Sequence, residues 1–167
     1  MDPATQIPDP IFDAIAQSAL AVFVRESMWT YPLLETLHVI GLALVFGPVL
    51  LFDLRVLGWN KDFAVSRLHR ALLPWVWTGF ALNASSGVLL FVSDAAEFAA
   101  NTSLRFKMAL LVLAGLNALY FHARIAPNVA AWDRENNAPT QARASAALSI
   151  ALWLAIITAG RMIAYIK

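Results

Sequence analysis

Three histidines and no cysteine set the range of metal chemistry open to this chain of 167 residues. His69 and His122 fall near the facing ends of two apolar segments, at what would be the same membrane boundary. Two imidazoles that face each other across a helical bundle are a usual way to hold the iron of a b-type haem. Gly115 and Ala118 lie on the same helical face as His122 and leave room for a flat macrocycle. The sequence therefore predicts a haem b site at His69 and His122; the alternative is a pair of solvated histidines at the boundary.

A second group of ionisable residues falls near the opposite boundary. His38 follows Glu35 by three residues, which puts both on one helical face. Lys107 opens the third apolar segment and Arg161 lies near the end of the fourth, at similar depth. Ionisable groups inside apolar spans are costly and are functional candidates by default. These four residues predict an outward-facing polar cluster for copper, a proton or a small anionic ligand. In the alternative, Glu35 and Arg161 neutralise each other and His38 only forms hydrogen bonds.

His38 is too far along its segment to share one iron with His69 or His122, because metal–imidazole bonds are about 2 Å long. A second haem at His38 would take its other ligand from the same side, where Met108 and Met162 are available. His/Met ligation is known for haem iron. The same His38, together with Met28, Met108 and Met162, also suits Cu(I), which prefers soft ligands. Plain packing is the alternative role for the methionines.

The elements that must position these residues are membrane helices. Hydrophobic residues make up 60% of the chain and charged residues 14%, against about 45–50% and about 25% in soluble domains. Apolar segments lie at about 31–52, 71–92, 106–125 and 144–166, each near the roughly 20 residues that a spanning helix needs. Backbone polar groups cannot go unpaired in lipid, so such spans are helical. We therefore expect an all-α, integral membrane four-helix bundle that forms a single domain.

A shorter apolar segment precedes the spans, at 11–24. It is too short to cross roughly 30 Å of hydrocarbon. Its apolar residues recur at helical spacing, so we predict an amphipathic helix lying along the membrane surface. A loosely ordered tail is the alternative. No positively charged region precedes this segment, so no cleavable signal peptide is expected.

The polar ends of the predicted spans indicate orientation. Basic residues are more numerous on the side that carries His69 and His122 than on the side of His38. The positive-inside rule places the richer side in the cytoplasm and both termini in the periplasm. Asn83 and Asn117 lie near the middle of their spans and are expected to form hydrogen bonds between helices.

Several function classes find no support in the sequence. The net charge of +1 and the lack of a basic stripe argue against a nucleic-acid partner. No Gly-rich phosphate loop, HExxH zinc helix or Gly-x-Ser-x-Gly elbow is present. Soluble-type hydrolase or nucleotide chemistry is therefore not expected, and the sequence leaves open whether the protein is an enzyme.

Ordered motifs from Trp29 to the C-terminus resemble a known family. The motifs are Glu35-Thr36-Leu37-His38-Val39-Ile40-Gly41, Asp53-Leu54-Arg55-Val56-Leu57-Gly58, Leu72-Leu73-Pro74-Trp75 with Gly79-Phe80, Arg105-Phe106-Lys107-Met108 and Gly115-Leu116-Asn117-Ala118. They resemble a family of small bacterial four-helix inner-membrane proteins of unknown function. The resemblance implies four spans and a bacterial inner-membrane location, with no assigned activity. The layout is more loosely similar to small membrane cytochromes b.

The hypothesis that joins these observations is a membrane electron-transfer module. It would bind haem b at His69 and His122, and exchange electrons with a quinone or a periplasmic redox protein. The first alternative is an outward-facing module that binds or transports copper, a proton or a small ligand. The second is a non-catalytic scaffold subunit of a larger membrane complex or oligomer.

Overall fold

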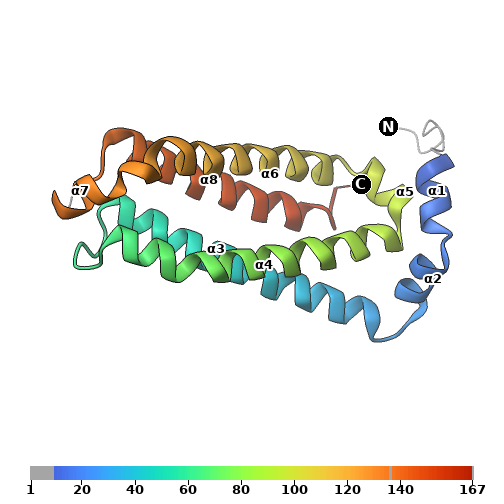
Figure 1. The fold of residues 1–167 in the computed structure, drawn as a ribbon. Coiled ribbons are helices and arrows are strands. Elements are labelled where there is room, and N and C mark those ends of the chain that lie inside the picture. Colours follow the sequence, from blue (N-terminus) through green and yellow to red (C-terminus); the bar gives the residue numbers. More distant parts are fainter. Residues whose placement is uncertain (1–9, 136, 167) are drawn as a thin grey trace.

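The computed structural model describes residues 10–135 and 137–166, and this part of the chain is helical with no strand. The elements are α1 (Pro10–Ala16), α2 (Ala19–Glu26), α3 (Thr30–Leu57), α4 (Val65–Ser93), α5 (Ala95–Ala100), α6 (Thr102–Tyr120), the π-turn η2 (Phe121–Ile125), the 3₁₀ turn η3 (Ala126–Asn128), α7 (Val129–Glu135) and α8 (Thr140–Met162). Figure 1 shows the four long helices running side by side, with both termini at one end and α7 at the other.

Within residues 10–135 and 137–166, four helices are long and apolar enough to cross a membrane: α3, α4, α8 and the continuous segment Thr102–Asn128. The predicted fold class is therefore confirmed, and the chain is that of a multi-pass membrane protein. The helices extend a few residues past most of the predicted spans, because the polar residues that flank each apolar stretch are themselves helical. Gly58 ends α3 in the left-handed conformation at φ 110°, which glycine adopts without steric cost.

The predicted surface helix at 11–24 is instead two short helices that lie across the end of the bundle (Figure 1). Ser18 separates them, because its hydroxyl accepts a hydrogen bond from the Ala21 amide and so caps α2. Ala21 and Val24 are fully buried against the bundle. Arg25 donates to the Ser93 carbonyl at 2.8 Å, which fastens α2 to the end of α4.

The bundle consists of two closely packed helix pairs, α3 with α4 and α6 with α8, joined where α3 meets α8. Small residues bring α3 and α4 together. A Cβ placed on Gly41 would lie 2.6 Å from the Asn83 backbone nitrogen, and one on Gly79 would lie 2.7 Å from Leu44. Small residues at such a seam are typical of membrane helices, whose backbones approach closely to gain van der Waals contact.

Polar contacts hold the end that carries α7. The Asp133 carboxylate accepts hydrogen bonds from the Val65 amide at 2.7 Å and the Ser66 hydroxyl at 2.7 Å, so it caps α4 from a distant part of the sequence. Arg55 is buried and donates to the carbonyls of Lys61 and Phe63 in the α3–α4 loop. Together these contacts fix the start of α4, and with it the position of His69.

Gly41→Ala tests the α3–α4 seam. The added methyl group meets backbone atoms that cannot move aside, so we expect a loss of about 1–3 kcal/mol in stability. Gly115→Ala is the matched control, because no atom lies within 4 Å of its Cβ position, and alanine favours a helix over glycine by up to about 1 kcal/mol. Thermal unfolding in detergent should separate the two variants. Equal midpoints would contradict the close seam.

Asp133→Asn tests the distant cap. Burial raises the pKa of Asp133, but hydrogen bonds from Ser66 and Val65 and the nearby Arg55 charge outweigh it and lower the pKa below its usual value. The carboxylate therefore stabilises the fold above about pH 4, the ordinary pKa of Asp, and this contribution is lost as the pH falls further. Both carboxylate oxygens accept hydrogen bonds, and an amide can accept through one oxygen only, so we expect the variant to lose about 1 kcal/mol at neutral pH, and the difference from wild type to vanish in acid.

The control for this cap is Asp62→Asn, in the exposed α3–α4 loop, which should leave the unfolding midpoint unchanged. A deficit of Asp133→Asn that persists undiminished at low pH would show that the carboxylate charge is not what stabilises the start of α4.

Candidate functional site

The structure brings His69 and His122 together at the end of the bundle that carries α7. Their Nε2 atoms lie 3.1 Å apart, and the ring centroids lie 5.2 Å apart with an interplanar angle of 53°. His69 comes from the second turn of α4, and His122 from the π-turn that continues α6. Single π-turns within helices are rare and occur frequently at functional sites. Two helices from different pairs of the bundle therefore converge on one imidazole pair.

Backbone contact fixes which nitrogen of His122 is available. Its Nδ1 lies 2.8 Å from the Ala118 carbonyl oxygen, which can only accept, so Nδ1 carries the hydrogen. The Nε2 lone pair then points toward His69, which donates to it when no ligand is present. A ligating histidine commonly donates its other ring N–H to a backbone carbonyl in this way.

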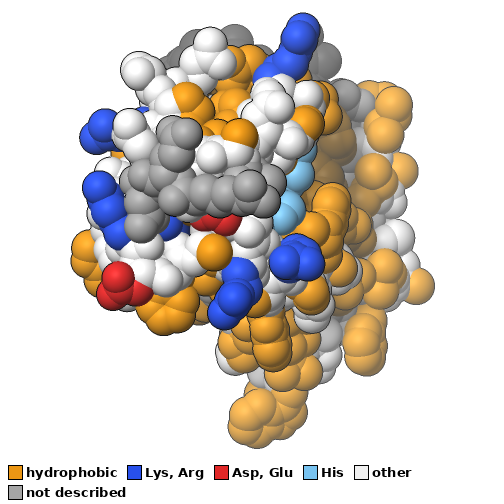
Figure 2. All heavy atoms as spheres, turned by 60° about the vertical axis from the view of Figure 1, so that its left-hand side comes forward, with side chains coloured by type: hydrophobic (Ala, Val, Ile, Leu, Met, Phe, Trp, Pro, Cys, Tyr) orange, Lys and Arg blue, Asp and Glu red, His pale blue; other side chains and the backbone are white. Residues whose placement is uncertain are grey.

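Aromatic and basic residues surround the pair. The Phe52 ring lies 5.7 Å from the His69 ring and 5.3 Å from Phe121. A cavity of about 240 Å³ lies beside His69, lined by Phe52, Ser66, His69, Arg70, Phe121, Ala126 and Val129. Figure 2 shows histidine atoms at the surface near this end, next to hydrophobic and basic side chains. The pair is thus open on one side and apolar on the other.

His38 is held in the α3–α4 seam, far from the other two histidines. Its Nδ1 lies 3.0 Å from the Asn83 carbonyl oxygen and 3.2 Å from the Ser86 hydroxyl. The Asn83 amide donates in return to the His38 carbonyl at 2.7 Å. His69 and Asn83 are both on α4, separated by about 21 Å of helix. The structure therefore separates His38 from the His69–His122 pair, as the sequence predicts.

Of the other residues predicted to lie near His38, Lys107 interacts with it, whereas no described contact joins Met108 or Met162 to it. Lys107 interacts electrostatically with His38, and its Nζ lies 3.6 Å from the Cβ position of Gly160. An ammonium group so placed opposes a second cation at His38. Met108 and Met162 are exposed, and no described contact joins either to His38. The copper set of His38, Met108 and Met162 stays a prediction that none of these contacts supports.

The expected neutralisation of Glu35 by Arg161 is not among the described contacts. Arg161 instead donates to the Tyr165 hydroxyl at 3.0 Å and lies 5.3 Å from the centre of the same ring. Tyr165 is four residues further along the chain, so Arg161 binds a neighbour in sequence rather than a residue of another helix. Glu35 is exposed.

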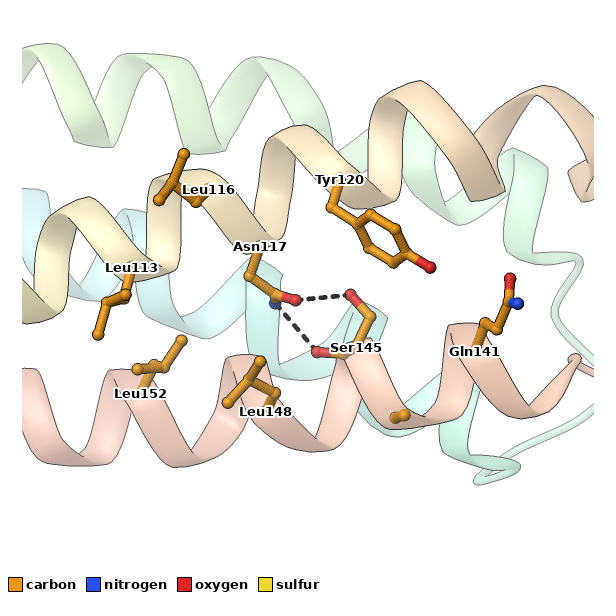
Figure 3. A pocket seen from close by; sticks show the side chains of 9 residues that line it. Leu113, Leu116, Asn117, Tyr120, Gln141, Ser145, Leu148 and Leu152 are labelled. Carbon is orange, nitrogen blue, oxygen red and sulfur yellow. Dashed lines mark hydrogen bonds between the residues drawn. The ribbon is translucent and has the colours of Figure 1, made fainter.

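The mid-span asparagines form the expected hydrogen bonds between helices. Asn117 donates to the Ser145 carbonyl at 3.0 Å and accepts from the Ser145 hydroxyl at 2.9 Å, which links α6 to α8. This link lies at a groove of about 540 Å³ on the α6–α8 pair, shown in Figure 3. The groove is larger than the cavity at His69 but includes no histidine. Sequence reasoning missed it because its leucines have the same pattern as any lipid-facing surface.

Comparisons with protein-family models, curated proteins and solved structures find no significant match for this chain. The functional argument therefore depends on the site itself.

Proposed function

We propose that this protein is a membrane redox module in which His69 and His122 ligate the iron of a b-type haem. The observation that carries the proposal is the 3.1 Å separation of their Nε2 atoms. Among the described residues, no group of three or more His, Cys, Asp and Glu side chains is placed to hold a metal ion. A haem needs only two protein ligands, because its macrocycle supplies the other four, so the number of ligands favours haem over a bare ion.

The residues present fit the ligand chemistry of haem, with one adjustment. The two Nε2 atoms, now 3.1 Å apart, would have to move apart to hold an iron between them. His122 is exposed, which allows it to swing outward. Phe52 would supply apolar contact, and Arg70 lines the cavity where it would pair with a haem carboxylate.

A bound haem would supply one-electron chemistry, and the chain would determine its environment. Ala118 would hold the ligating tautomer of His122, and the Phe52 and Phe121 rings would limit the access of water to one face of the site. Both effects tune a haem potential. The His69–His122 pair lies at the end opposite the termini, the end that the distribution of basic residues assigns to the cytoplasm. A lipid-soluble quinone is therefore favoured over a periplasmic protein as the electron partner.

A single copper or zinc ion is the second candidate, because the distance between the Nε2 atoms of His69 and His122 favours it. Two imidazoles at bond lengths of about 2.0–2.1 Å in tetrahedral positions have nitrogens about 3.3 Å apart, close to the observed 3.1 Å. Water would have to complete the coordination.

The absorption spectrum of the detergent-purified protein, reduced minus oxidised, tests the proposal. We expect a Soret band and a pyridine haemochrome signal of haem b in wild type. His69→Ala and His122→Ala should each lose most of the bound haem, since each removes an axial ligand. His38→Ala is the control and should keep the haem content of wild type, because His38 binds Asn83, which lies about 21 Å along α4 from His69.

A wild-type protein expressed with sufficient haem that shows no Soret band would reject the haem proposal. Metal analysis of the same sample would then decide the second candidate: copper or zinc retained by wild type and lost from His122→Ala would support an ion at this pair.

A further inference from the structure

The groove between α6 and α8 has the form of a ligand site within the membrane. Its volume of about 540 Å³ lies within the roughly 300–1,000 Å³ of small-molecule sites. The residues that line it come from both helices: Leu113, Leu116, Asn117, Tyr120, Gln141, Ala144, Ser145, Leu148 and Leu152. Both helices are membrane spans, so the open side of the groove faces lipid.

The groove is apolar along its length and polar at one end. Leucines line the part nearer the middle of the spans, and Tyr120 and Gln141 lie at the end nearer α7 (Figure 3). The Tyr120 hydroxyl points along the groove toward Gln141. Both side chains are exposed, and no described hydrogen bond uses either one. Two hydrogen-bond donors are therefore available at the head of an apolar channel.

The other polar groups of the groove exclude a charged ligand. Asn117 and Ser145 bind each other through two hydrogen bonds, which leave both side chains neutral and engaged between the helices. No Lys, Arg, Asp or Glu is among the residues that line the groove. A phosphate or carboxylate head would lose its hydration here without a counter-charge, which is costly. The occupant should have a neutral head that accepts hydrogen bonds, and an apolar tail.

We propose that this groove binds a lipid-soluble quinone, with its ring at Tyr120 and Gln141 and the start of its tail among the leucines. The Tyr120 hydroxyl and the Gln141 amide donate to the quinone carbonyl oxygens. Tyr120 precedes His122 by two residues, so their Cα atoms lie about 3 Å apart along the helix axis, while the two side chains project from nearly opposite sides of the helix. The electron-transfer role of the quinone depends on the proposed function, whereas its binding does not.

Equilibrium binding of labelled decylubiquinone to the purified protein in nanodiscs tests this site. Leu148→Trp fills the groove and should weaken binding at least about tenfold, the effect of a steric loss of roughly 1.4 kcal/mol. Leu154→Trp is the matched control, because Leu154 is an equally exposed leucine of α8 that does not line the groove; its affinity should equal that of wild type. Tyr120→Phe and Gln141→Leu should each weaken binding about two- to tenfold.

Two results would overturn the quinone site. Wild-type affinity in Leu148→Trp would show that the groove is not where quinone binds. Displacement of the quinone by phosphatidylglycerol at similar concentration would show that the groove holds ordinary membrane lipid.

The haem spectrum of each sample separates this inference from the proposed function. Groove-dependent quinone binding in a protein without haem would support the quinone site and reject the haem. Haem bound at the histidine pair, with quinone binding that is absent or insensitive to Leu148→Trp, would support the haem and reject the quinone site.

Discussion

Lipid offers no hydrogen-bond partner, so each polar group within the spans must find one inside the protein. This constraint explains why polar side chains of the spans pair between helices. His38 and Asn83 bind each other's backbone carbonyl across the α3–α4 seam. Asn117 and Ser145 link α6 to α8, also through two hydrogen bonds. Asp53 departs from the rule, since it is 5% exposed and its Oδ2 has no hydrogen-bond partner.

The two ends of the bundle use their polar residues differently. Around His38, the ring Nδ1 and the backbone carbonyls of His38 and Asn83 are paired across the two helices, and the result is a tightly packed seam. At the other end the Asp133 cap and the π-turn hold His69 and His122 against each other, with open space beside them. The Nε2 lone pair of His122 has no described partner except the His69 ring, and this is why we propose the function at that end.

Hydropathy and helical spacing were sufficient to predict the four spans, the convergence of His69 with His122 and the separation of His38. These features follow from segment length and depth alone. The Asp133 cap could not be predicted, because it joins residues 68 positions apart in the sequence, with α4, α5 and α6 between them. The division of 11–24 into two helices depends on one serine cap. The Arg161 contact was missed because Tyr165, four residues away, competes with any partner on another helix.

Cross-linking tests whether His69 and His122 meet at one point of the bundle. The chain has no cysteine, so His69→Cys and His122→Cys can be combined without background and treated with a short bifunctional thiol reagent in native membranes. The account predicts an intramolecular cross-link for this pair and none for His38→Cys with His122→Cys. Failure of the first pair to cross-link, while a monofunctional reagent labels both thiols, would contradict it.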